Sequence, residues 1–339
     1  MKNTTLLTCL AFFLSMGLSS AQETIEELVQ EGIYYHDDKQ YDKAIEYYKK
    51  ALEIDPLSTL VNYELALSYF TKGDWEEAIK YSDIVLKQRK DNLLQAYMTK
   101  GSALDMLGRT KESIKLFEKA IKKEGGHYLL YYNLAVNYFK MNDNVNAELN
   151  LLKGLELNPN HPSSHFMLAE IQMNRGEKVR TILPLYFFLL LEPDTQRSVN
   201  AYNMLMETLG QGVSKNPEEP NTIQISFNPD KDKDFGAAEL MISMLGAVND
   251  LEELQEKTAE EKFQDNTQSI FKMLGEMKKD DKTGIYWELY VPFFYGLAQS
   301  DHMEAYCNYI TQSGNENAKA WIQSNNTKLE AFGTWLNQE

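Results

Sequence analysis

Cysteine is almost absent from this chain of 339 residues, which contains only Cys9 and Cys307. We expect Cys9 to be removed with an N-terminal segment, which leaves one thiol and no internal disulfide. A disulfide-stabilised scaffold of the kind found in small secreted domains is therefore excluded, and the sequence gives Cys307 no evident role. With 43% hydrophobic residues, the chain has enough apolar side chains for one large or two ordinary cores.

Basic residues are also scarce, since 34 lysines and arginines stand against 50 aspartates and glutamates, and the formal net charge is -16. A nucleic-acid-binding surface needs a basic patch that neutralises phosphates. We therefore expect no nucleic-acid partner and interpret the acidic surface as a source of solubility.

The apolar run at residues 6–14 is too short to cross a bilayer. Lys2 precedes this run, and the small residues Ser19, Ser20 and Ala21 follow it, which is the arrangement of a secretory signal peptide. The sequence therefore predicts an exported protein, periplasmic or secreted, with no membrane-spanning segment after cleavage of the signal.

The chain does contain a unit of about 34 residues that recurs five times. Its clearest copy, residues 28–56, has an apolar helical face in each half and ends at Pro56. The small residues that open the second half recur at intervals of 34, 35, 34 and 34: Ala44, Ala78, Ser113, Ala147 and Thr181. Twelve residues earlier stand Gly32, Ala66, Gly101, Ala135 and Ala169. A fixed period of this length predicts helix pairs that stack on their neighbours.

These small, aromatic and proline positions resemble those of the tetratricopeptide repeat family. The resemblance covers residues 25–195 and implies an all-α, right-handed solenoid of five helix pairs, with the first helices lining a concave surface. The family's leading tryptophan is replaced by Leu28 in the first unit and by His165 in the fifth. The fifth unit also has Gln172 at the position where the other units have tyrosine or leucine. Members that hold the acidic C-termini of chaperones use basic and amide side chains in the groove, whereas Val29 and Glu64 stand at or near two of those places. That ligand is therefore not expected.

The period fades after residue 195, and Pro217 lies in a stretch of turn-forming residues. The predicted organisation is a signal peptide over 1–21, a repeat array over 22–209 with five repeats at about 25–195 plus a following helix, a linker over 210–234, and a C-terminal helical domain of diverged helix pairs over 235–339.

The sequence makes a separate structural prediction for each of several segments after the fourth repeat. Residues 182–191 are apolar all round, which predicts a helix buried on more than one face where the C-terminal domain docks. The alternation at 222–227 predicts a short strand or an extended tether along a helical surface, because no pairing partner is evident. We expect a diverged helix pair at 286–297 and 303–311, and one closing helix over 318–336.

The predicted concave surface is rich in aromatic, aliphatic and methionine side chains. In the register of the repeats these residues are Tyr63, Leu67, Phe70, Met98, Tyr132, Val136, Phe139, Phe166 and Met173. Exposed apolar patches usually mark contacts, and aromatic anchors favour a peptide or helix as ligand. We therefore predict a non-enzymatic scaffold that binds a protein or peptide partner in this groove, in the cell envelope.

Three alternatives remain open. The C-terminal domain can be a ligand-binding or enzymatic module, whose candidate cluster is Tyr286, Trp287, Tyr290, Tyr295 and His302. The groove can serve self-association, or it can be filled by the chain's own C-terminal domain or by the tether. A deep pocket with convergent polar groups would favour the first of these alternatives.

The sequence shows no catalytic constellation and no cofactor motif. Asp230, Asp232 and Asp234 alternate as in a calcium-binding loop, but Met241 stands where that loop needs its glutamate. We interpret this segment as a solvated turn that caps a helix and expect no metal and no cofactor.

Overall fold

A computed structural model describes residues 23–216, 219–226, 232, 234–248, 257–279 and 281–338. The described chain is helical apart from one two-stranded hairpin, which confirms the all-α prediction. It divides into two compact units, one ending at Lys123 and one beginning at Glu124. The predicted signal peptide lies outside the described residues.

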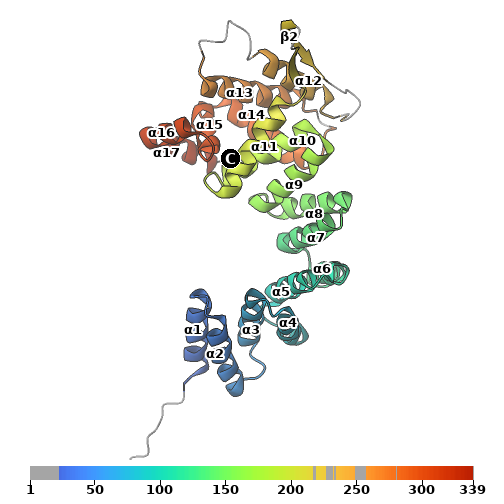
Figure 1. The fold of residues 1–339 in the computed structure, drawn as a ribbon, viewed down its shortest axis with the longest axis vertical. Coiled ribbons are helices and arrows are strands. Elements are labelled where there is room, and N and C mark those ends of the chain that lie inside the picture. The colour runs from blue at the N-terminus through green and yellow to red at the C-terminus, as the bar shows by residue number, and fades with distance from the viewer. Residues whose placement is uncertain are drawn as a thin grey trace, which may run out of the picture. The chain divides into compact units, whose positions relative to one another are not determined.

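Unit 1 consists of three helix pairs (Figure 1). Its helices are α1 (Ile25–Asp37), α2 (Tyr41–Ile54), α3 (Thr59–Lys72), α4 (Trp75–Gln88), α5 (Leu93–Met106) and α6 (Thr110–Glu124), which ends at the border of the unit. Thr24 caps α1 with a capping box, in which its hydroxyl accepts from the Glu27 backbone N–H and the Glu27 carboxylate accepts from the Thr24 backbone N–H. Gly73 ends α3 in the left-handed conformation at φ 95°, which glycine adopts without a steric penalty.

Glycine allows close contact between the two helices of the first and third pairs. A Cβ atom on Gly32 would lie 2.3 Å from Cε1 of Tyr48, and one on Gly101 would lie 2.1 Å from Cζ of Phe117. The aromatic ring of each second helix thus packs on bare backbone of the first. This contact is the physical reason for the glycine at that position in these two repeats.

Unit 2 contains the remaining repeats and the C-terminal half. Its elements are α7 (Tyr128–Lys140), α8 (Asn144–Leu157), α9 (Pro162–Arg175), α10 (Lys178–Leu191), α11 (Gln196–Gly210), β1 (Val213–Asn216), β2 (Glu219–Ile225), α12 (Gly236–Val248), α13 (Ala259–Met277), a π-helical turn (Tyr286–Tyr290) that continues into α14 (Val291–Gln299), α15 (Met303–Thr311), α16 (Glu316–Ser324) and α17 (Asn326–Leu336). None of the helices in the described part of the chain is long and apolar enough to span a membrane.

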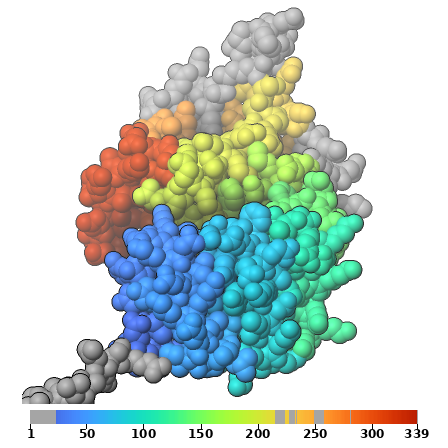
Figure 2. Space-filling view, turned by 60° about the horizontal axis from the view of Figure 1, so that its bottom comes forward, coloured from blue at the N-terminus to red at the C-terminus, as the bar shows by residue number. Residues whose placement is uncertain are grey.

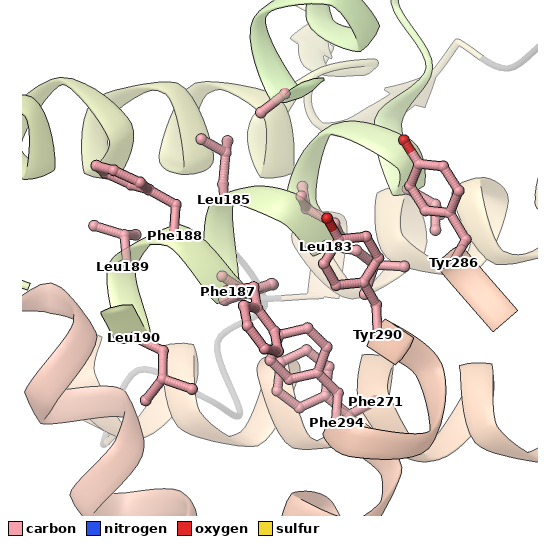
Figure 3. Packing of buried hydrophobic residues seen from close by; sticks show 14 of the residues in the cluster. Leu183, Leu185, Phe187, Phe188, Leu189, Leu190, Phe271, Tyr286, Tyr290 and Phe294 are labelled. Atoms are coloured by element: carbon pink, nitrogen blue, oxygen red, sulfur yellow. The ribbon is translucent and has the colours of Figure 1, made fainter. Parts of the chain in front are cut away.

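Helix α10 confirms the prediction of a helix buried on more than one face. Every side chain from Thr181 to Leu190 is buried, in one cluster with residues of α13, α14 and α15 (Figure 3). The Tyr186 ring meets Phe271 edge-on at 5.0 Å, and Phe271 stacks on Phe294 at 4.4 Å. The fifth repeat and the C-terminal helices therefore share one core, and the domain boundaries at 210–234 stay a prediction.

The C-terminal helices also lie directly against α11. In Figure 2 the red helices at the end of the chain adjoin the yellow-green surface of α11. The Tyr202 ring of α11 covers Gly314, where an added Cβ atom would lie 2.2 Å from Cδ1 of that ring. Side chains from both sides of the predicted linker thus form a continuous surface.

The short strand predicted at 222–227 is present in its described residues as part of β2, but the expectation that it has no pairing partner is wrong. Strand β2 pairs antiparallel with β1, with Val213 opposite Ile225 and Lys215 opposite Ile223, and the hairpin contacts α12. Strand β1 could not be predicted from the sequence, because its residues are VSKN and valine is the sole apolar residue among them.

The single closing helix predicted over 318–336 is also wrong. Asn325 leaves the helical conformation at φ -129° and ψ 41°, and its side-chain amide donates to the carbonyl oxygen of Trp321 at 2.8 Å. Such a bond competes with the regular helical pattern, so that α16 ends and α17 begins at this asparagine. The predicted pair at 286–297 and 303–311 is confirmed, with a π-helical turn at its start.

Candidate protein-binding surface

The groove residues predicted in unit 1 lie along one edge of α3 and on the neighbouring α5. Tyr63, Leu67 and Phe70 follow each other at the spacing of a helical face and are partly exposed. Leu65 and Tyr69 of the same helix are buried. We use the name unit 1 strip for the surface formed by Tyr63, Leu67 and Phe70 of α3 and the partly exposed Met98 of α5.

The groove residues predicted in unit 2 form a second set, the unit 2 strip, and all of them are partly exposed. Its members are Tyr132, Val136 and Phe139 of α7, and Phe166 and Met173 of α9. The Tyr132 ring meets His161 edge-on at 4.8 Å. Phe166 packs on Phe188 at 5.0 Å, and the Arg197 guanidinium lies 5.5 Å from the centre of its ring. Helix α11 therefore holds Phe166 in place. The role of both strips in binding stays a prediction.

Polar groups accompany the unit 1 strip between α1 and α3. The His36 ring nitrogen Nδ1 lies 2.7 Å from the Ser68 hydroxyl, and burial lowers the pKa of His36. Burial, with a smaller contribution from the Asp37 charge, raises the pKa of Glu64. The sequence showed that Glu64 departs from the residues of the family's basic groove. It did not show the environment of Glu64, because that depends on how α1 packs against α3.

The fifth repeat departs from the family pattern where it contacts the C-terminal half. His165 is fully buried, and its Nε2 lies 2.6 Å from the carbonyl oxygen of Pro159. Because that oxygen can only accept, Nε2 carries the proton, and the Tyr290 hydroxyl donates to Nδ1 at 2.7 Å. Gln172 donates to Tyr286 at 3.3 Å. His165 and Gln172, which depart from the family pattern, therefore make polar contacts between the fifth repeat and the helices that follow it.

A buried charged network joins the start of α10 to the segment before α12. The Arg180 guanidinium donates to Asp232 at 2.8 Å and to Asp234 at 3.1 Å. Asp232 also accepts from the backbone N–H groups of Asp234 and Phe235, so that it caps the turn before α12. The turn caps a helix as expected. The Asp234 side chain is 41% exposed, but Asp232 is 6% exposed, so that the prediction of a solvated turn is wrong for Asp232. Asp230 lies outside the described residues.

Most of the aromatic cluster predicted as an alternative site belongs to the core. Tyr286, Trp287 and Tyr290 are at most 4% exposed, and Tyr295 packs on Gly275. His302 is partly exposed against the rings at the end of the chain.

A cavity of about 420 Å³ lies elsewhere in unit 2, between α11, α13, α15 and α16. It is lined by aromatic, carboxylate and amide side chains, among them Tyr202, Trp321, Glu260, Glu304 and Asn308. The sequence did not indicate it, because its walls come from four helices that are separated along the chain.

Helix pairs that repeat with a fixed period and present one strip of each first helix define an α-helical repeat protein. Sequence profiles described as tetratricopeptide repeat match residues 35–101, 94–122 and 128–161. These residues therefore contain tetratricopeptide repeats, as the spacing of the small residues predicts.

Two curated proteins illustrate these similarities. The chain is 26% identical over 138 residues to the human protein O-mannosyl-transferase TMTC1. The aligned region covers 40% of this chain and only 15% of that protein. The chain is also 26% identical over 202 residues to the Hsp70-Hsp90 organising protein of Plasmodium falciparum. This aligned region covers 57% of this chain and 77% of that protein.

Solved structures with similar folds include two described by their role or source. PilW, a type IV pilus biogenesis factor, aligns with 68% of this chain and 97% of its own, at 19% identity and a TM-score of 0.47. Pseudomonas aeruginosa pilF aligns with 55% of this chain and 88% of its own, at 21% identity and a TM-score of 0.46.

Proposed function

We propose that this protein is a non-enzymatic adaptor that holds a protein or peptide partner against the strips on its first repeat helices. The observation that carries the proposal is the presence of nine partly exposed apolar side chains at helical spacing on α3, α5, α7 and α9. Such side chains gain free energy when a partner covers them. The Plasmodium relative is named for organising two other proteins, which supports a protein as the ligand. The signal peptide predicted over residues 1–21 supports a place in the cell envelope.

Substitutions in the strips should reduce partner binding. We expect Tyr63→Ala with Leu67→Ala in unit 1, or Tyr132→Ala with Val136→Ala in unit 2, to lower partner recovery at least tenfold, because truncating a central anchor typically costs about 2 kcal/mol or more. The measurement is quantitative mass spectrometry after capture from an envelope extract, with circular dichroism to verify that the variants fold.

A matched control removes apolar side chains from another surface. Leu149 and Leu157 of α8 are 49% and 54% exposed, and their replacement by alanine should leave recovery unchanged. Equal recovery by the strip variants and the native chain would refute the proposal. Light scattering of the native chain separates partner binding from self-association.

The cavity in unit 2 favours a second function, the binding of a small polar molecule by the C-terminal half. Its volume of about 420 Å³ is in the range of small-molecule sites, and its aromatic, amide and carboxylate side chains can pack on and hydrogen-bond a hydroxylated ligand. Asn308→Tyr should fill this cavity.

We expect a monosaccharide that raises the melting temperature of the native chain to have no effect on the Asn308→Tyr variant, since a ligand that binds the folded state stabilises it by mass action. The measurement is a thermal-shift screen of neutral monosaccharides. If the same sugar shifts both proteins equally, it binds elsewhere, and if none shifts the native chain, this second function is excluded for that ligand class.

A further inference from the structure

A second cavity lies in unit 2, between α10, α11, α12 and α13. Its volume is about 310 Å³, and its walls are mostly aliphatic and aromatic, with Leu209, Ile242, Leu245, Phe263 and Ile270 among them. We call it the apolar cavity, and we call the cavity of about 420 Å³ between α11, α13, α15 and α16 the polar cavity. Because protein interiors are normally packed without such voids, an apolar space of this size suits an apolar ligand.

Polar groups contribute little to the apolar cavity. The hydroxyls of Thr267 and Tyr186 belong to buried residues and lie 3.1 Å apart, so that they form a hydrogen bond with each other. The other polar side chains of its walls, Lys262 and Asn266, are partly exposed to solvent. A ligand group in this cavity therefore gains free energy by burying hydrocarbon rather than by making hydrogen bonds.

The two cavities adjoin each other at three shared residues. Met206, Ala259 and Phe263 line both of them. Met206 is 41% exposed and Ala259 is also exposed, which places this junction at the surface of unit 2. The thioether side chain of Met206 is flexible, so that it can adjust to a ligand that passes it. A single ligand can therefore have its apolar end in one cavity and its polar end in the other.

The polar cavity suits a hydroxylated headgroup without a charge. Glu260 accepts hydrogen bonds from the side-chain amides of Asn315 and Asn317, at 3.2 and 2.9 Å. Glu304 accepts from the Trp321 indole at 2.9 Å and forms an ion pair with a lysine of α17. Because both carboxylates already have partners, a cationic headgroup is not required, and their charges disfavour an anionic one. Hydroxyl groups can both donate to these carboxylates and accept from the amides.

We propose that the C-terminal half binds a single-chain amphiphile, with its alkyl chain in the apolar cavity and an uncharged, hydroxylated headgroup in the polar cavity. The alkyl chain passes the junction at Met206, Ala259 and Phe263. This inference rests on the small-molecule function proposed for the polar cavity and adds the apolar part of the ligand. The alternative amphiphile is a fatty acid whose carboxylate meets Lys262, and the test distinguishes the two.

The test uses isothermal titration calorimetry of the full chain with methyl glucoside, octanoate, and octyl glucoside below its critical micelle concentration. Octyl glucoside should bind at least a hundredfold more tightly than methyl glucoside, because its alkyl chain is removed from water. It should bind at least tenfold more tightly than octanoate, whose carboxylate would meet Glu260 and Glu304. A negative heat-capacity change for octyl glucoside, absent for methyl glucoside, would mark burial of the alkyl chain.

Two substitutions assign the two parts of the ligand. Leu245→Trp places an indole in the apolar cavity and should weaken octyl glucoside binding at least tenfold, while methyl glucoside binding stays unchanged. Asn308→Tyr in the polar cavity should weaken the binding of both glucosides. Leu149→Trp is the matched control, since Leu149 is 49% exposed on α8 and lines neither cavity. Circular dichroism verifies that each variant folds.

Several results would overturn the proposal. Equal affinities of the native chain for octyl and methyl glucoside would remove the alkyl-chain site and leave the small-molecule function in place. Undiminished binding of octyl glucoside by a folded Leu245→Trp variant would place the alkyl chain elsewhere. Octanoate that binds as tightly as octyl glucoside would show that the polar cavity does not receive the headgroup. Failure of both glucosides to bind would count against this proposal and the small-molecule function together.

Discussion

Replacing Phe271 by alanine will lower the free energy of unfolding of unit 2 by about 3–5 kcal/mol, the usual cost of removing a buried phenylalanine ring. Phe271 of α13 is fully buried, stacks on Phe294 and meets Tyr186 of α10 edge-on. Because the ring fills space between the fifth repeat and the C-terminal helices, its loss should loosen α9 and α10 together with α13.

Hydrogen exchange followed by mass spectrometry measures this effect segment by segment. We expect faster exchange in α10 of the Phe271→Ala variant, although the substitution lies far away along the sequence. Phe117→Ala is the matched control, since Phe117 is 1% exposed in unit 1. That control should accelerate exchange in α5 and α6 and leave α10 unchanged. Native exchange in α10 of Phe271→Ala would contradict a core shared by the repeat and the C-terminal half.

Acidification from pH 7.5 to 5 will cost the native chain about 2 kcal/mol more than a His165→Gln variant. Burial lowers the pKa of His165 to about 4, against an ordinary value of 6.5. Above pH 6.5 the ring is neutral in both the folded and the unfolded state. Between pH 6.5 and 4 only the unfolded state takes up the proton, so that stability falls by about 1.4 kcal/mol per pH unit.

Urea unfolding at several pH values measures this difference. The His165→Gln variant should be less stable at pH 7.5, because it loses part of the contact with Pro159 and Tyr290. The free energies of unfolding of the two proteins should nevertheless converge as the pH falls to 5. Parallel pH dependences would show that His165 does not remain neutral in the folded state.

The repeat architecture could be predicted from the sequence because it depends on local rules. Small residues at a fixed period, such as Gly32 and Gly101, are required wherever an aromatic ring of the next helix packs on backbone. The burial of α10 was equally predictable, because a helix with apolar side chains all round must be covered on all sides. The nine strip residues also follow from the repeat register, and all of them are partly exposed.

The features that the sequence did not reveal depend on contacts between distant segments. The pairing of β1 with β2 leaves almost no apolar alternation in β1, and the break at Asn325 arises from one side-chain hydrogen bond. The environment of Glu64 required the approach of α1 to α3, and the walls of the cavity required four helices in place. Contacts between distant segments leave no pattern along the chain. His165 and Gln172 could nevertheless be seen in the sequence as departures from the repeat pattern.

Those exceptions have a consequence for how the length of the array can vary. Tandem repeats usually gain or lose copies because each unit offers the same face to the next. The face that the fifth repeat turns to the following helices is different, since His165 and Gln172 bond to tyrosines that no further repeat would supply. A duplicated unit placed directly after α10 would leave Nδ1 of the buried His165 without the Tyr290 hydroxyl that donates to it, and Gln172 without its bond to Tyr286. Copy number in this protein can therefore change only among the earlier repeats, and the fifth must remain next to the C-terminal half.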